Sequence, residues 1–464
     1  MRYALTWVTL LCMLAPAAPC AEEAGRDEVP VTRLKLQPAP EPVPALKYRL
    51  LPGVLEMEPG NAATLYNWAV AKITGGQNGN TKELLELLEM PIEDLTIARV
   101  RAARAPHGRG PLFRLLERAG RREDCDWDLE LSVGPALDLP SITDQRKLAT
   151  IAVLTARMEI VWGNCEEAVQ MLQTPLAMAR HMAQGAALIH GLVGMQVARL
   201  ALDRVEDLAQ APGSPNLYWA LTALPRPLID MRDPVETERH MFDLWLPDLR
   251  DPESSRLGPE GWREMIEQFP SLGGGSGPLR RKLTPSLVAL WMYTDAKNHL
   301  IERGRDPDQV EAMPVFQMVA IYVMDGWNRV MDDQFKWFYV PYAEGEEVIA
   351  EAQASFTETL DQKNDILPAM LMPALYGTYS QMAGLDRQVA ALRCIEAVRL
   401  YAALHDGELP ASLSEIKEVP VPLNPMTGES FQYEVVGETA TLSAPLGPHE
   451  RAKDGIRYEL TIAK

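Results

Sequence analysis

The longest regular pattern of apolar and polar positions runs from 149 to 231. Apolar and small residues recur every three or four positions over 148–160, which places them on one face of a helix. Gly163 and Asn164 interrupt this pattern, and two glutamates follow, as is typical of a helix end and the first turn of the next helix. The pattern predicts two helices joined by a tight turn at Gly163.

The rest of the chain continues this helical pattern until its last sixty residues. There the periodicity changes to the alternation of short strands, at 429–436, 439–444 and 456–462. Gly437 and its neighbour form a two-residue hairpin connection, and 424–428 carries a strong turn signal. The fold class predicted is mainly α. It is an irregular helical array, with a degenerate solenoid as the alternative, and a small C-terminal α+β module.

Composition divides the chain further. The segment 38–44 is rich in proline, and 273–277 reads Gly-Gly-Gly-Ser-Gly, which is typical of a flexible connection. The organisation predicted from these features is a signal peptide at 1–21, a disordered tether at 22–44, a helical body at 45–270, a flexible linker at 271–285, a second helical segment packed on the body at 286–385, and the α+β module at 386–464.

The first 21 residues have the order of a secretory signal. Arg2 is followed by an apolar run over 4–14 and a region of small residues before cleavage. The run is too short for a permanent membrane span, and no later stretch is apolar enough for one. We expect an exported protein of the periplasm or cell envelope, without a transmembrane segment after cleavage. The alternative, a lipid anchor on Cys20, is disfavoured because the residues before it lack the usual leucine.

Three cysteines remain after the signal, namely Cys125, Cys165 and Cys394. An odd number of thiols in an oxidising compartment permits at most one internal pair. The candidate disulfide is Cys125 with Cys165, and three buried free thiols are the alternative.

The charge of the chain restricts its partners. Lysine and arginine number 45 against 64 aspartates and glutamates, for a net charge of −19. Sequence-independent binding of nucleic acid needs a basic surface, so we expect no nucleic-acid partner. Docking on an anionic membrane face is disfavoured for the same reason.

Motifs that carry known chemistry are missing from the sequence. It contains no G-x-S-x-G elbow, no phosphate-binding loop, no dinucleotide-binding glycine pattern and no HExxH pair. The aspartates at 124–128 lack the glycine and closing glutamate of a calcium loop. We therefore predict no catalytic residues, no metal site and no cofactor, which favours a non-enzymatic protein.

One group of residues is a candidate for partner binding. Tyr218, Trp219, Arg226 and Asp230 combine aromatic and charged side chains around a proline-broken helix. The alternative is structural, with an ion pair between Arg226 and Asp230 or a nearby glutamate.

Three resemblances add to these expectations. The hairpin at 163–168, with Ala156 before it and Leu172 after it, resembles one tetratricopeptide repeat, a class that binds peptides or partner proteins. The segments PALKYRLLPGVLEMEPGNAATLYNWA, GSPNLYWALTALPRPLID, VEAMPVFQMVAIYV and DDQFKWFYVPY resemble a family of exported bacterial α-helical proteins without an established activity.

The third resemblance concerns the C-terminal part. LPASLSEI at 409–416 and VPLNPMTGESFQYEV at 421–435 resemble the soluble tail of type II secretion pseudopilins. The chain departs from a pseudopilin because it lacks the N-terminal membrane helix with its processing motif.

The function predicted from all of this is that of an exported binding or scaffold protein for a protein or peptide partner in the cell envelope. One alternative is a hydrolase with an unrecognised carboxylate or histidine site. Another is a structural component of an envelope or secretion assembly.

Overall fold

The computed structural model describes residues 28–74, 81–102, 108–130, 142–185, 187–245, 247–252, 255–268, 285–345, 348–349, 351, 366–446 and 452–464. The predicted signal peptide at 1–21 and the predicted linker at 271–285, except Pro285, lie outside these residues.

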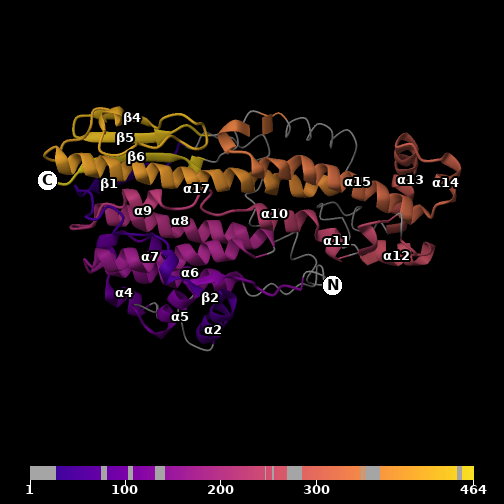
Figure 1. The fold of residues 1–464 in the computed structure, drawn as a ribbon, viewed down its shortest axis with the longest axis horizontal. Coiled ribbons are helices and arrows are strands. Elements are labelled where there is room, and N and C mark those ends of the chain that lie inside the picture. The colour runs from indigo at the N-terminus through magenta and orange to yellow at the C-terminus, as the bar shows by residue number, and fades with distance from the viewer. Residues whose placement is uncertain are drawn as a thin grey trace.

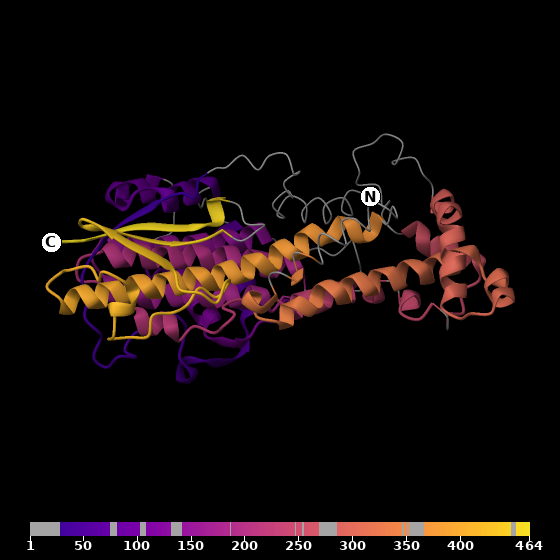
Figure 2. The same cartoon turned by 90° about the horizontal axis from the view of Figure 1, so that it is seen from above.

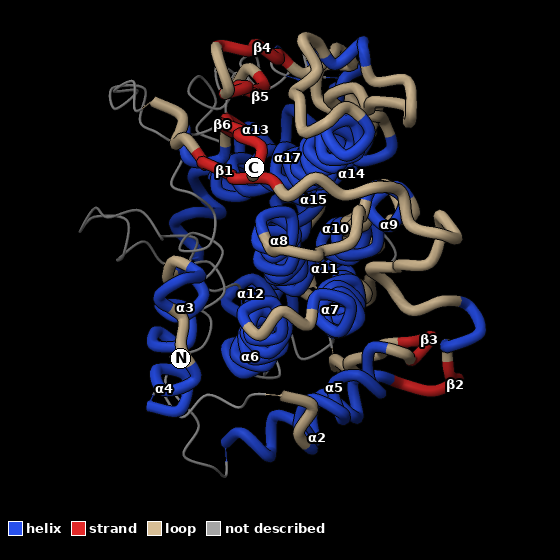
Figure 3. Tube along the Cα trace, turned by 90° about the vertical axis from the view of Figure 1, so that its left-hand side faces the viewer, coloured by secondary structure: helices blue, strands red, loops and turns tan. Residues whose placement is uncertain are grey.

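Three consecutive helices form the centre of the helical body. They are α6 (Ile142–Val161), α7 (Cys165–Ala183) and α8 (Leu188–Gln210), and short connections make each antiparallel to the next. Gly163, at φ +79°, ends α6 in a conformation that glycine adopts without a steric penalty. The predicted hairpin with a break at Gly163 is thus confirmed. Figure 3 looks down these three helices.

The longest helix is α17 (Ile366–Leu404), which runs along α8 and reaches beyond the body (Figure 1). Every side chain from 387 to 400 is buried, so this stretch is covered on all sides. The predicted boundary at 386 is therefore wrong. It falls inside α17, which belongs to the core of the body and does not begin an appended module.

The sheet has four strands in the order β1-β6-β5-β4. The antiparallel strands β4 (Gln432–Val436), β5 (Thr439–Ala444) and β6 (Ile456–Ile462) follow the prediction, and Gly437 turns the hairpin at φ +63°. The predicted turn also forms, since the Gly428 amide donates to the Asn424 carbonyl.

The fourth strand comes from the other end of the chain. β1 (Thr32–Leu36) pairs in parallel with β6, and its two leucines, Leu34 and Leu36, are buried. The disordered tether predicted at 22–44 is therefore wrong for these residues. The short alternation of leucines with charged residues gains its stability only from a partner strand 426 residues away.

A distal arm projects from the body, away from the sheet (Figure 2). It consists of α13 (Pro285–Glu302) and α14 (Pro307–Ala312), which share a small core with the start of α15 (Val315–Phe335). The rest of α15 packs against α10 and α17. The buried side chains of the body, including those of the sheet, form one contiguous core.

The remaining helical elements are short: η1 (Val54–Glu56), α2 (Ala62–Thr74), α3 (Thr81–Glu89), η2 (Ile92–Asp94), α4 (Ile97–Ala102), α5 (Pro111–Gly120), α9 (Tyr218–Thr222), α10 (Arg232–Arg239), α11 (Met241–Trp245), η4 (Pro247–Leu249), α12 (Pro259–Gln268), η6 (Lys336–Tyr339), η7 (Leu413–Glu415) and η8 (Ala452–Asp454). A separate two-stranded sheet pairs β2 (Glu58–Asn61) with β3 (Arg122–Asp124).

The fold class predicted from the sequence is confirmed. The protein is mainly α-helical with a small α+β region at its C-terminal end. The α-helices range from 5 residues in α9 to 39 in α17, so the array is irregular. In the part of the chain that the structure describes, no helix combines the length and the apolar character needed to cross a membrane.

Candidate functional site

A half-buried polar stripe runs along one side of α8, whose other residues are mostly apolar and buried. Its members are Gln196, Arg199, Asp203, Glu206 and Gln210. They recur at intervals of three and four residues, so the helix places them above one another on one side. This stripe faces α17 and the sheet.

Two side chains from distant parts of the chain meet the stripe. Gln388 of α17 donates its amide Nε2 to Asp203 Oδ1 at 2.9 Å. Tyr458 of β6 donates its hydroxyl to Glu206 Oε1 at 2.7 Å. The alternation of β6 explains the second contact, because it turns Ile456, Tyr458 and Leu460 toward the helices. We call Asp203, Glu206, Gln388 and Tyr458 the Asp203–Glu206 site.

Some acceptors at this site are unused. Gln388 is only 9% exposed, and its Oε1 has no hydrogen-bond partner among the described residues. The same holds for the buried Oε1 of Gln196, two turns earlier on the stripe. Because buried polar groups in native proteins nearly always have partners, such oxygens are free to accept from a water molecule or another donor.

The electrostatics of the site are set by burial. Burial raises the pKa of Glu206 to about 7, and repulsion from Asp203 adds to this, whereas the Tyr458 hydrogen bond opposes it. Burial also raises the pKa of Asp203, and the positive charge of Arg204 counteracts the rise. The pKa of Tyr458 is raised well above its usual range, mainly by burial, so its hydroxyl remains a donor.

The raised pKa of Glu206 predicts a pH effect on stability. Between about pH 4.5 and about pH 7 the unfolded chain loses this proton before the folded chain does. The contribution of Glu206 to stability therefore falls as the pH rises through this window. We therefore compare the free energy of unfolding of Glu206→Gln with that of the wild type at about pH 4.5 and at about pH 8. The difference should shift in favour of Glu206→Gln by about 1–2 kcal/mol from the lower to the higher pH, a value reduced to allow for partial exposure.

Urea unfolding of both proteins at the two pH values measures this difference. Gln can still accept the Tyr458 hydrogen bond, so the packing is retained. Glu434→Gln, at an exposed strand position, is the control and should show no such gain. If Glu206→Gln differs from the wild type in free energy of unfolding by the same amount at both pH values, the pKa of the Glu206 carboxyl is not raised in the folded protein.

The four residues predicted to bind a partner differ in their exposure and in their contacts. Tyr218 is buried, where it accepts from Arg393 Nη2 at 3.0 Å and donates to the carbonyl of Pro420. Trp219 donates its indole Nε1 to Glu41 Oε1 at 2.6 Å. Tyr218 is thus unavailable to a partner, and both aromatic side chains hold other segments in place.

The two charged members interact with other residues. Asp230 forms its ion pair with Arg232, and this lowers the pKa of the Asp230 carboxyl. Arg226 is exposed and acts on the carboxyl of Asp386 instead. The predicted alternative, an ion pair of Arg226 with Asp230, is therefore not the pair that forms.

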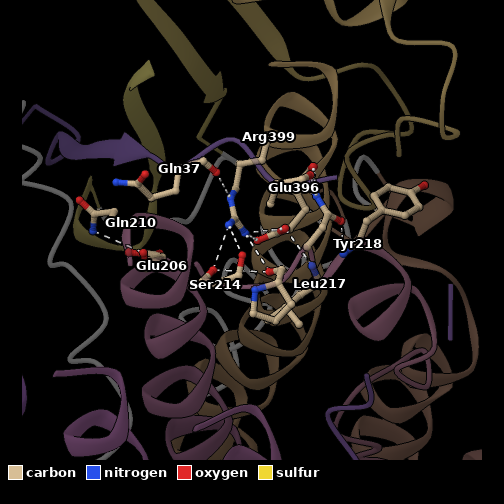
Figure 4. A network of polar contacts seen from close by, with 11 residues as sticks. Gln37, Glu206, Gln210, Ser214, Leu217, Tyr218, Glu396 and Arg399 are labelled. Atoms are coloured by element: carbon tan, nitrogen blue, oxygen red, sulfur yellow. Dashed lines mark hydrogen bonds and ion pairs between the residues drawn. The ribbon is translucent and has the colours of Figure 1, made fainter. Parts of the chain in front are cut away.

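A second polar network, around Arg399, is structural (Figure 4). Arg399 and Glu396 on α17 are fully buried and form an ion pair in which Arg399 Nη1 donates to both carboxylate oxygens of Glu396, at 2.7 and 2.8 Å. Arg399 also donates to the Ser214 hydroxyl at 2.9 Å and to the Gln37 carbonyl at 2.8 Å, and Glu396 accepts from the Leu217 amide at 2.9 Å. The network ties α17 to the N-terminal segment and to the loop after α8.

The three cysteines among the described residues are buried free thiols, so the predicted disulfide between Cys125 and Cys165 does not form. Cys165 begins α7, while Cys125 lies next to Trp127, which donates to the carbonyl of His181 near the other end of α7. That end lies 16 residues further along (181 − 165 = 16), about 24 Å at 1.5 Å per residue. A disulfide needs Cα atoms within about 7 Å.

Among the described residues, no cluster of three or more histidine, cysteine, aspartate or glutamate side chains is arranged to hold a metal ion. The chemistry that the Asp203–Glu206 site offers is hydrogen-bond acceptance and negative charge.

The Asp203–Glu206 site was not among those predicted from the sequence. The available signal was the spacing of the five polar residues at 196–210 within an otherwise apolar helix. Comparison of the chain with models of known families, with curated proteins and with solved structures finds no match. The resemblances to the exported helical family and to the pseudopilin tail therefore remain predictions.

Proposed function

We propose that this chain is an exported protein of the cell envelope that binds a protein or peptide partner through the Asp203–Glu206 site. The observation that carries the proposal is the combination of two mostly buried carboxylates, each with some exposed surface, with the unpartnered Gln388 Oε1. The exposed parts of the two carboxylates are where a partner would make contact, and Gln388 Oε1 is a buried acceptor close behind them.

The rigidity of the surroundings supports this function. α8, α17 and β6 contribute to one contiguous core, so the three elements hold the site residues without a partner. Asp203 is held by Gln388 and Glu206 by Tyr458. A site that is already ordered loses little conformational entropy on binding, which favours affinity.

The charge of the chain supports a partner that carries positive charge at its contact point. The net charge of −19 attracts such a partner over long distances and repels acidic ones. The envelope location rests on the signal-like order of residues 1–21.

A second candidate function is a hydrolase that uses Glu206 as general acid or base. The observation that favours it is the Glu206 pKa of about 7, which is suited to proton transfer near neutral pH. Tyr458 beside it supplies a hydroxyl donor at 2.7 Å.

Selection from a random peptide display library tests the binding function. The full chain is the target, and the double variant Asp203→Asn/Glu206→Gln is used for counter-selection. Peptides recovered in this way should bind the wild type in calorimetry and bind the double variant at least about tenfold more weakly, since the charge-assisted bonds are lost. Glu434→Gln should bind them as the wild type does.

Equal binding to the wild type and to the double variant would exclude the site as the point of contact. Cleavage of a recovered peptide by the wild type, abolished in Glu206→Gln, would favour the hydrolase instead.

A further inference from the structure

We propose that His181 and His190 form an acid-sensitive latch, which holds α2 and residues 122–127 on the ends of α7 and α8 and releases them when the pH falls. The latch consists of four side chains in mutual contact, namely Tyr66, Trp127, His181 and His190. The inference does not rest on the proposed binding function.

The segments that the latch holds lie on the outer side of the body. In Figures 1 and 3, α2 and the strands β2 and β3 lie beyond α6 and α7, on the side away from α17 and the four-stranded sheet. We call α2, β2 and residues 122–127 the outer layer. α7 packs on α8 and α8 packs on α17, so these three helices keep their own contacts when the outer layer opens.

The hydrogen bonds of His181 require its neutral form. Its Nε2 donates to the backbone carbonyl of Arg122 at 3.0 Å, because a carbonyl can only accept. Nδ1 of the neutral ring is then the acceptor, and the hydroxyl of the fully buried Tyr66 donates to it at 3.0 Å. A second proton on Nδ1 would occupy the position of the hydrogen that Tyr66 donates, so this bond between α2 and α7 would have to break or reverse inside the core.

The ring of His190 is also fully buried, and neither of its nitrogens has a hydrogen-bond partner among the described residues. It stacks on the indole of Trp127, with ring centroids 6.2 Å apart, and Trp127 stacks in turn on Tyr66 at 5.8 Å. The indole Nε1 donates to the His181 carbonyl at 3.0 Å. A proton on His190 would therefore place a charge in the core without an acceptor to compensate it.

The electrostatics agree with this geometry. Burial lowers the pKa of both histidines to about 4. At His181 the hydrogen bond to the Arg122 carbonyl opposes the fall in pKa. The positive charge of Arg180 adds to the fall, whereas the negative charge of the exposed Asp124 opposes it.

Other titratable groups around the latch supply little negative charge in acid. Glu238 of α10 accepts from the first backbone amide of α8, and burial raises its pKa to about 7, so this carboxyl is neutral below that pH. Burial also raises the pKa of the Cys125 thiol and of the Tyr66 hydroxyl, which therefore stay neutral. Arg122 directs its side chain to Glu58, at 3.3 Å.

Burial of neutral histidines makes the closed latch weaker in acid. Between about pH 6.5 and about pH 4 an exposed histidine binds a proton and a histidine in the closed latch does not. Protons therefore favour the open form, and the closed form loses stability as the pH falls through this window. Each histidine should raise the equilibrium constant for opening by about tenfold from pH 7 to pH 5.

Amide hydrogen exchange of the full-length protein at pH 7 and at pH 5 tests the latch. Protection factors are corrected for the intrinsic pH dependence of exchange. In the wild type, the protection of α2 and of residues 122–127 should fall by about a hundredfold at pH 5, because the two tenfold effects multiply. The buried stretch 387–400 of α17 should keep its protection.

Neutral substitutions assign the loss of protection to the two histidines. His181→Gln keeps one donor and one acceptor, and His190→Phe keeps an aromatic ring against Trp127. Each single variant should lose about tenfold in protection of the outer layer at pH 5, and the double variant should lose little. The control is His405→Gln, because His405 is an exposed histidine that pairs with Glu418, and it should behave as the wild type does.

The comparison is made between the two pH values within each protein, so a variant that is less stable at both values still gives an answer. If His190→Phe is unfolded at pH 7, His190→Leu takes its place. Loss of protection that is confined to the outer layer and absent from the double variant supports the latch. Unchanged protection in the wild type, an equal loss in the double variant, or an equal loss in 387–400 overturns it.

Discussion

Replacement of Glu396 by alanine is expected to lower the free energy of unfolding by about 3–5 kcal/mol. Glu396 and Arg399 are both fully buried, and their side chains are 1% and 0% exposed. Removing the carboxylate leaves a guanidinium charge without compensation in the core. It also leaves the Leu217 amide without its acceptor. Both consequences raise the free energy of the folded state and so lower the free energy of unfolding.

Urea unfolding followed by circular dichroism measures this loss. The matched control is Glu459→Ala, which removes the partner of Arg33 in a pair whose arginine is 78% exposed. Surface pairs contribute about 0–1 kcal/mol, so the control should differ little from the wild type. Similar effects of the two substitutions would show that the Arg399 network is open to water.

Replacement of Leu36 by alanine is expected to lower the free energy of unfolding by about 2–4 kcal/mol. Leu36 is fully buried in β1 between the sheet and α8, and its carbonyl accepts from the Ala463 amide at 2.8 Å. The substitution removes apolar surface from the core and leaves a cavity that the rigid surroundings cannot close completely. A residue of a disordered tether would tolerate the same change.

Lys35→Ala is the control, since the side chain of Lys35 is exposed on the same strand and its backbone pairing with Thr461 is retained. Denaturant midpoints of the two variants give the comparison. A Leu36→Ala protein within about 0.5 kcal/mol of the wild type would mean that β1 contributes little to the fold in solution.

Several elements could be predicted from the sequence because their determinants are local. The turn at Gly163, the hairpin at Gly437 and the turn at 424–428 each depend on residues within a few positions of one another. Glycine tolerates a positive φ wherever it stands, and the change of period from helix to strand is visible within one segment. The fold class follows from these signals.

Such local signals did not reveal where α17 begins, and they did not reveal the strand β1. The buried stretch of α17 shows little amphipathic contrast because α8, α9, α15 and the sheet cover it on all sides. β1 has five residues and pairs with a strand at the opposite end of the chain. A short segment of this kind is stable only when its partner is present.

The candidate site also depends partly on local sequence and partly on tertiary contacts. The spacing of Asp203 and Glu206 along α8 is a property of the sequence, whereas Gln388 and Tyr458 are separated from them by 185 and 252 residues. Only the tertiary structure brings these side chains together, and only their approach excludes enough water to raise the pKa of Glu206. Local periodicity and turn chemistry are thus determined by neighbouring residues, while burial, pairing and pKa depend on contacts that the packed chain alone creates.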